Sequence, residues 1–155
     1  MNSFIRKARK SRGFTLVELL IVIIIIGILA GAMLLVAGSS TDKANATKIV
    51  SNLRTIKAAA LLYYADNNNW PTIGGIGSQL DSYIDRDLTG DPDLTYSFVA
   101  GTAGGDIYIQ VALANAYAVG GVQTALADMA GKSGLCQDAA GVVYSTGTNV
   151  LMVVK

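Results

Sequence analysis

A long run without a single charged side chain limits most strongly how this chain can fold. The run, LLIVIIIIGILAGAMLLVA, occupies residues 19–37. In a helix, about 20 apolar residues that rise 1.5 Å each span the roughly 30 Å hydrocarbon core of a bilayer. The rest of the chain has the Gly, Ala and Ser content of an ordinary soluble domain. We therefore expect an apolar segment attached to a globular body.

The start of the chain allows two conventional interpretations of this run. Five basic side chains and no acidic one precede residue 13. A secretory signal cleaved near 37–39 would have an apolar region of about 7–15 residues, and this run is longer. A transmembrane anchor fits the length better, and the positive-inside rule then keeps the basic start cytoplasmic and places the body outside.

Glu18 lies at the beginning of the apolar segment, and neither interpretation explains it. On insertion scales, an acidic residue at the centre of a membrane helix costs roughly 2.5–3.5 kcal/mol. The side chain can avoid much of that cost at the headgroup boundary, by extending toward water. Otherwise it needs a partner of opposite charge.

The residues around Glu18 match a known signal. The sequence KSRG at 10–13, followed by FTLVELL at 14–20, resembles the class III signal of type IV pilins and type II secretion pseudopilins. The resemblance implies that a membrane-embedded prepilin peptidase cuts between Gly13 and Phe14 and that the new amino group of Phe14 is N-methylated. It also implies that Glu18 is the glutamate on which assembly of this family depends.

The physical chemistry of the cut chain agrees with the resemblance. Cleavage would place an α-ammonium on Phe14, one helical turn from the Glu18 carboxylate. Each charge is unfavourable in lipid alone, and each is a suitable partner for the other. In a staggered stack, the ammonium of one copy can reach Glu18 of its neighbour. We expect this pair to set the register of assembly.

An amphipathic helix is predicted to continue from the apolar run. One stripe of helical period runs through Ile49, Leu53, Ile56, Ala60 and Tyr63. The Asn run at 67–69 and Pro71 then end the helix. The stretch YYADNNNWPT at 63–72 resembles the segment that ends the long helix in major pseudopilins. We expect its aromatic side chains, Tyr63, Tyr64 and Trp70, to belong to the core.

Short elements are predicted after this helix. The pattern indicates helices at 79–86 and 122–130, the second ended by Gly131. It indicates strands at 94–100 and 107–114 joined by a Gly-rich hairpin, and a last hairpin from 142–145 and 150–154. The predicted fold class is α+β, with a long N-terminal helix packed on a small antiparallel sheet. The predicted division is a cleaved leader at 1–13, a membrane and assembly helix at 14–38 and a globular domain at 39–155.

An acidic stretch offers a candidate metal site. Asp85, Asp87, Asp91 and Asp93 alternate with other residues in DRDLTGDPD. Carboxylates in such a loop can surround Ca²⁺, which takes six to eight oxygen ligands. The spacing is not that of an EF-hand, so a solvated acidic loop without calcium is the other interpretation. No further cofactor is expected.

Composition argues against an enzyme and against nucleic-acid binding. The chain contains no His, so the commonest general base and zinc ligand is missing. Cys136 is the only cysteine, and we expect it to be buried. Without the five leader cations, seven basic side chains remain against 11 acidic ones, and such a body does not attract phosphates.

The expected function is therefore that of a structural subunit of a type IV pilus-like filament, which polymerises through its N-terminal helix. The main alternative is a major pseudopilin of a type II secretion system, and a weaker one is a membrane-anchored extracytoplasmic binding or enzymatic domain within 72–155. The resemblance implies as partners further copies of the chain, prepilin peptidase, an assembly platform and inner-membrane lipid. It implies the inner membrane as the first location, with the N-terminus cytoplasmic, and then a surface pilus or a periplasmic pseudopilus.

Overall fold

The structure is a computed structural model with two compact units, Met1–Ala37 and Gly38–Lys155. It describes residues 13–72, 76–88, 90–102 and 104–155, and for residues 35–37 the backbone alone. Helix α1 (Leu16–Asn67) runs through parts of both units. This agrees with the prediction that the apolar run continues as an amphipathic helix. Of the leader predicted at 1–13, residues 1–12 lie outside the described residues.

In the first unit, the described side chains of α1 are all exposed. The helix is apolar around its whole circumference here, and among the described residues of this unit none covers it. It is the one described helix long and apolar enough to cross a membrane by length and composition. A helix of this kind needs lipid or other helices around it.

In the second unit, the predicted apolar face of α1 packs against the core. Ile49, Leu53, Ile56 and Ala60 are completely buried, whereas Tyr63 is half-buried. The helix ends where the asparagines begin, and Asn68 has a φ of 50°. Asparagine tolerates this left-handed conformation better than most residues, so the stop arises where the sequence predicts it.

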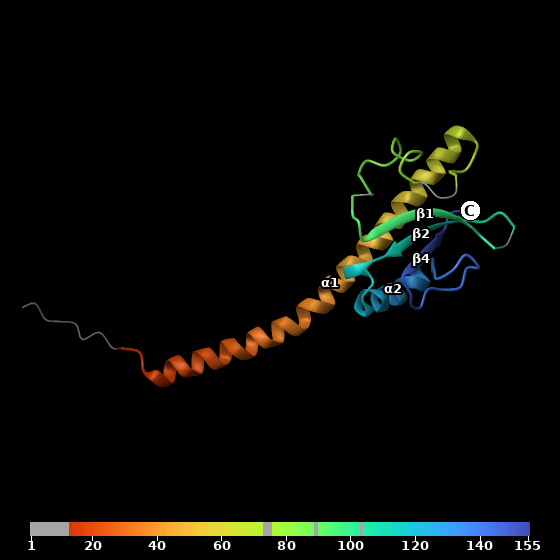
Figure 1. Cartoon of the computed structure of the whole chain (residues 1–155). Coiled ribbons are helices and arrows are strands. Elements are labelled where there is room, and N and C mark those ends of the chain that lie inside the picture. The colour runs from red at the N-terminus through yellow and green to blue at the C-terminus, as the bar shows by residue number, and fades with distance from the viewer. Residues whose placement is uncertain (1–12, 73–75, 89, 103) are drawn as a thin grey trace, which may run out of the picture. The chain divides into compact units, whose positions relative to one another are not determined.

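A four-stranded antiparallel sheet lies against this half of α1 (Figure 1). Its order is β1-β2-β4-β3. The strands are β1 (Leu94–Ala100), β2 (Ile107–Leu113), β3 (Leu135–Cys136) and β4 (Asn149–Val153). The α+β class, with a long helix on a small antiparallel sheet, is confirmed.

The predicted hairpin between β1 and β2 is present. The two strands pair from Leu94 with Leu113 to Ala100 with Ile107. At the turn, the Gly101 N–H donates to the Asp106 carbonyl over 2.8 Å. A Cβ on Gly101 would lie 2.8 Å from the Cβ of Asp106 and 2.9 Å from the Tyr108 ring, closer than side chains pack. Glycine is therefore required at this position.

A short 3-10 helix, η1 (Asn115–Tyr117), and helix α2 (Gly120–Ser133) follow β2. The predicted helix at 122–130 is confirmed, but its end is not at Gly131. That glycine lies inside α2, and Gly134, with a φ of 66°, caps it instead by donating to the Ala130 carbonyl. Glycine in this conformation ends a helix without steric cost.

At the beginning of α2, Gly121 contacts Asp42 of α1. A Cβ on Gly121 would overlap with Asp42 Oδ2. The absent side chain thus permits the two helices of the body to approach each other closely.

The helix predicted at 79–86 is wrong, because this segment forms consecutive turns. Its backbone bonds include Leu80 to the Ile76 carbonyl and Tyr83 to the Leu80 carbonyl. Leu80 is buried and the Arg86 guanidinium donates to Thr55 Oγ1 of α1 over 3.2 Å. Anchors to α1 therefore hold the segment, and so short a helix would not offset its nucleation cost.

The last hairpin is also predicted wrongly. Residues 142–145 form no strand, and β4 pairs with β2 and β3. Asp138 Oδ1 accepts the N–H groups of Ala140 and Val142, both over 3.1 Å. This turn brings Val143 opposite Cys136 as an isolated bridge. A side-chain turn thus decides a pairing that strand propensity does not show.

The core of the second unit is apolar and continuous. It is built from one face of α1, the inner faces of the sheet, α2 and the turns at 76–88. Its largest buried side chains include Tyr144, Phe98, Ile49, Leu53, Ile56, Leu80, Ile109 and Leu126.

Candidate assembly site and polar cluster

The beginning of α1 holds the residues that the sequence assigns to cleavage and assembly. Gly13 and Phe14 precede the first helical residue, and the Phe14 side chain is 83% exposed. A Cβ on Gly13 would meet no atom within 4 Å. The Gly13–Phe14 peptide bond is therefore non-helical and open, which is what a peptidase requires of a scissile bond.

Glu18 forms a reciprocal set of hydrogen bonds with Thr15. Its Oε2 accepts the Thr15 backbone N–H over 2.9 Å and the Thr15 hydroxyl over 2.8 Å. The Glu18 N–H donates in return to Thr15 Oγ1 over 3.2 Å. This is a capping box, which satisfies backbone donors that have no partner inside the helix. The Thr-x-x-Glu spacing is typical of this box, so Glu18 has a local structural role besides the predicted role in assembly.

The exposed apolar segment has two glycines on one face. Gly27 and Gly31 are one turn apart, and no neighbouring atom would meet a Cβ at either position. A small residue at every fourth position permits two membrane helices to approach closely. The first unit thus combines an uncovered apolar surface, a place for close helix contact and one carboxylate at its beginning.

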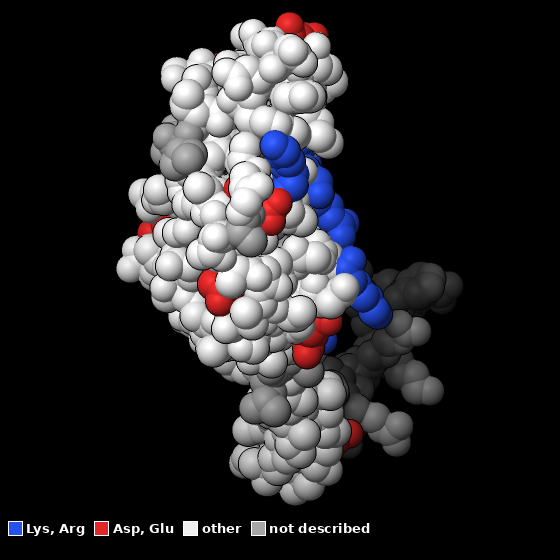
Figure 2. Space-filling model, turned by 90° about the vertical axis from the view of Figure 1, so that its right-hand side faces the viewer, with Lys and Arg blue, Asp and Glu red and all other residues white. Residues whose placement is uncertain are grey.

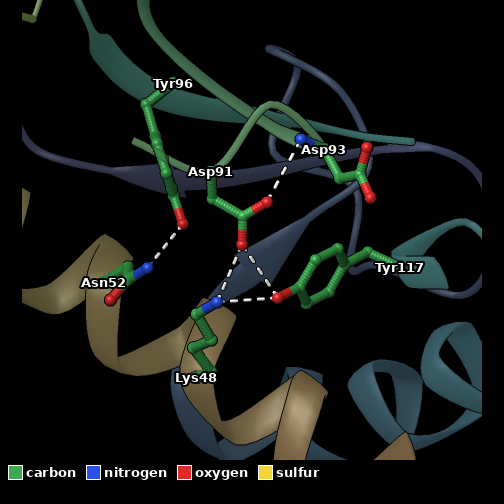
Figure 3. Close-up of polar contacts among 6 residues, drawn as sticks. All are labelled: Lys48, Asn52, Asp91, Asp93, Tyr96 and Tyr117. Carbon is green, nitrogen blue, oxygen red and sulfur yellow. Dashed lines mark hydrogen bonds and ion pairs between the residues drawn. The ribbon is translucent and has the colours of Figure 1, made fainter. Parts of the chain in front are cut away.

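A polar cluster in the body joins three elements (Figure 3). The Lys48 ammonium of α1 donates to Asp91 Oδ2 over 2.8 Å and to the Tyr117 hydroxyl of η1 over 2.7 Å. The Tyr117 hydroxyl donates to the same Asp91 oxygen over 2.9 Å. The Lys48 ammonium lowers the pKa of Asp91, with a smaller contribution from Tyr117, and the Asp91 carboxylate raises the pKa of Lys48. We conclude that this cluster fastens the segment before β1 to α1.

Neighbouring polar groups extend the cluster. Asn52, the buried polar residue of α1, donates to the Tyr96 hydroxyl of β1 over 2.7 Å. Burial raises the pKa of Tyr96. Asp93 Oδ1 accepts from the Asn115 amide over 2.6 Å. Each of these groups has a partner within the body, so the contacts stabilise the body.

The four aspartates predicted to surround calcium do not converge. Asp91 binds Lys48 and Tyr117, and Asp93 binds Asn115. Asp85 and Asp87 line an open hollow of about 610 Å³, of which neither Asp91 nor Asp93 is a lining residue. Within the described ranges, no group of three or more His, Cys, Asp or Glu side chains could hold a metal ion. Calcium binding stays a prediction.

The aromatic side chains at the end of α1 are only partly in the core. Tyr64 is exposed and stacks on half-buried Trp70 with ring centroids 4.5 Å apart. The prediction of a core position is wrong for Tyr64, because its position falls outside the apolar stripe. Tyr63 and Trp70 pack against the edge of the core.

Cys136, predicted to be buried, is half-buried in β3. Desolvation raises the pKa of its thiol, so the thiolate nucleophile is disfavoured.

Comparisons with known proteins agree with the signal at the beginning of the chain. Residues 8–34 match the family described as "Prokaryotic N-terminal methylation motif". This range contains Gly13, Phe14 and Glu18.

Curated relatives are similar over the N-terminal part of the chain. The type II secretion system core protein G of Pectobacterium carotovorum is 35% identical over 71 residues, 46% of each chain. The same protein of Escherichia coli K12 is 39% identical over 67 residues, 43% of this chain and 46% of that one. The match thus spans less than half the length of these relatives.

The fold has a solved counterpart. The structure of the major type IV pilin PilA1 from Clostridium difficile aligns with 75% of this chain and 98% of its own, with a TM-score of 0.51 and 20% identity. At this identity the likeness concerns the fold. The chain thus carries the prepilin-type N-terminal segment of type IV pilins and type II secretion pseudopilins, and it has a pilin-like fold.

Proposed function

We propose that this chain is a structural subunit of a filament, cut between Gly13 and Phe14 and polymerised through the first half of α1. The observation that carries the proposal is the uncovered apolar helix of the first unit, with Glu18 and its capping box in the first turn. Such a helix is stable in lipid as a single copy and in the core of a polymer as one of many.

Glu18 has different partners at the successive stages of this proposal. In the uncut chain its carboxylate is satisfied by Thr15. After cleavage, a new ammonium appears on Phe14, and in the polymer the Glu18 of one copy pairs with the ammonium of the next. A buried ion pair contributes more to register than to net stability, so the pair selects one stagger between copies.

The partners and locations follow from this sequence of events. Prepilin peptidase performs the cut, and the basic leader holds the N-terminus on the cytoplasmic side of the inner membrane. An assembly platform then moves copies from lipid into the polymer. The body shows paired polar groups where an enzyme would need a nucleophile beside a base, so we assign it a structural role.

Two kinds of filament are consistent with this role. The relatives named core protein G favour a periplasmic pseudopilus of a secretion system. The fold of PilA1 favours a surface pilus. Deletion of the gene distinguishes them, since loss of secreted proteins indicates the first and loss of surface filaments the second.

Processing is the first testable consequence. Intact-mass measurement and N-terminal sequencing of the membrane-extracted chain should give a mature protein that begins at Phe14 and carries one methyl group on its amine. A chain that begins at Met1, or near Gly38, would contradict the proposal.

A further inference from the structure

One face of α1 in the body is turned away from the core. It contains residues spaced by three or four positions, all exposed, which we call the α1 stripe. Residues with this spacing share one side of a helix. The α1 stripe consists of Lys43, Thr47, Ser51, Arg54, Ala58, Leu61 and Ala65.

The α1 stripe is basic in its first half and apolar in its second. No partner holds the Lys43 ammonium among the described residues, and the Arg54 guanidinium donates to the Ser133 hydroxyl over 3.2 Å. Figure 2 shows basic side chains gathered in a row along one edge of the body. Toward the end of the helix, Leu61 is 46% exposed and lies between Ala58 and Ala65. The small residues keep the helix backbone accessible.

An acidic surface of matching character lies elsewhere on the same body. The open hollow of about 610 Å³ is lined by Asp81, Asp85 and Asp87, with Ile84 and Arg86. Arg86 directs a guanidinium nitrogen to Thr55 of α1. We call this surface the acidic hollow. The acidic hollow has carboxylates around the apolar side chain of Ile84. The α1 stripe has cations and the apolar side chain of Leu61.

The two surfaces lie on different sides of α1. The turns at 76–88 reach α1 through Thr55, which accepts from Arg86, and through Asp66, which accepts from the Tyr83 hydroxyl over 3.0 Å. At 3.6 residues per turn, Thr55 and Asp66 lie about 90° and about 105° around the helix from the centre of the α1 stripe. The α1 stripe of a copy therefore does not face its own acidic hollow.

We infer that the α1 stripe of one copy binds the acidic hollow of the next copy in the filament. Two different surfaces in contact form a heterologous interface, which repeats into an open helical polymer. Opposite charges across it would select the partner and the register more than they add affinity. This inference rests on the proposed function and names a second contact, in the body, beside the one at Glu18. The partner is another copy because every copy carries the complementary acidic surface.

Charge reversal tests the contact in cells that assemble the parent chain. The basic variant Lys43→Glu/Arg54→Glu and the acidic variant Asp81→Lys/Asp85→Lys should each lower the yield of sheared filaments about tenfold or more, since like charges then face each other. The fourfold variant that combines them restores opposite charges and should recover most of the yield. Lys155→Glu, a cation outside the α1 stripe, is the matched control and should assemble as the parent does.

The outcomes separate this inference from the proposed function. A parent chain that forms no filament overturns both. If the parent assembles and the reversal variants give the same filament yield, the inference alone is overturned. The inference is also overturned if the fourfold variant gives no higher filament yield than the double variants. Loss of binding to anionic phospholipid vesicles in the basic variant, with filament yield intact, would assign the α1 stripe to lipid headgroups and would also overturn it.

The salt dependence of filament disassembly tests the same contact on the parent protein, so the test does not depend on whether a reversal variant folds. When salt rises from about 0.1 M to about 1 M, the Debye length falls from about 10 Å to about 3 Å. Sheared parent filaments should then release subunits, and filaments of the neutral variant Lys43→Gln/Arg54→Gln should release them already at the lower salt. If parent and variant filaments release subunits at the same salt concentration, the result would contradict the charged contact.

Discussion

At the scale of single residues, the ion pair of Lys48 and Asp91 makes the stability of the body depend on pH. The pKa of Asp91 is lowered in the folded chain, so its contribution to stability is present above the unfolded value, about 3.9, and disappears as the pH falls through the folded one. The pKa of Lys48 is raised, so its contribution persists until the pH rises above the ordinary value, about 10.4. The pair therefore stabilises the body throughout the neutral range.

Asp91→Asn tests this pair. At pH 7 the substitution should lower the free energy of unfolding by about 1 kcal/mol, a small value because the side chains are 47% and 29% exposed. The difference from the parent should shrink as the pH falls below the unfolded value of about 3.9, and it should vanish only once the pH is below the lowered pKa of Asp91, where the carboxylate of the parent is protonated. Thermal unfolding of the detergent-solubilised full chain measures both.

Asp81→Asn serves as the control, because this exposed carboxylate has no partner within the part of the body that the structure describes. It should leave stability unchanged at both pH values. If Asp91→Asn behaved in the same way, the cluster would not fasten the segment before β1 to α1.

Single residues also show how far sequence reasoning reaches. Glu18 stands out because a carboxylate next to an apolar run is costly. Its hydrogen bonds to Thr15 follow from the Thr-x-x-Glu spacing, which is typical of a capping box, and not from the charge of Glu18. The contact between Lys48 and Asp91 joins positions 43 residues apart, and no local pattern predicts it.

At the scale of elements, the periodicity of apolar residues predicts the regular helices and strands. It does not predict segments whose conformation depends on one side-chain contact. Helix α1, strands β1 and β2 and the turn between them follow from spacing and glycine positions. The segment at 79–86 has one helical pair of apolar residues, Leu80 and Ile84, but contacts with α1 hold it in turns. The bridge between Cys136 and Val143 depends on Asp138, whose role as a turn former is not visible in hydrophobicity.

The acidic segment before β1 gives a prediction at this scale. Calcium bound by Asp85, Asp87, Asp91 and Asp93 would require Asp91 to leave Lys48 and Tyr117. We therefore expect neither calcium nor a chelator to change the Tm of the full chain in detergent. A rise of several degrees with calcium, lost in Asp85→Asn/Asp87→Asn, would contradict this expectation and establish the calcium site.

At the scale of the whole molecule, the sequence separates an apolar anchor from a body because the charge-free run ends where Gly, Ser and Lys begin. The family resemblance also lies in that N-terminal part, where lipid and assembly limit which residues are acceptable. The architecture of the body was predicted only as a class. Its order of strands depends on long-range pairing of β4 with β2 and β3, which a single sequence does not show.

The central claim is that copies polymerise through the N-terminal helix with Glu18 as the register group. Glu18→Ala removes the carboxylate, whereas Thr15→Ala removes the capping box at a cost of about 1 kcal/mol and keeps the carboxylate. In the polymer, loss of the carboxylate leaves a Phe14 ammonium buried without a partner, at a cost of several kcal/mol. Insertion, cleavage and the stability of the body should be nearly unchanged in both variants.

The yield of sheared filaments, counted by electron microscopy for the parent and both variants, tests this claim most directly. We predict that Thr15→Ala assembles nearly as well as the parent, while Glu18→Ala is cleaved normally, accumulates as membrane monomer and forms few filaments, even when it is expressed together with the parent. A normal yield from Glu18→Ala, or an equal loss in both variants, would contradict the assignment of Glu18 as the register group of assembly.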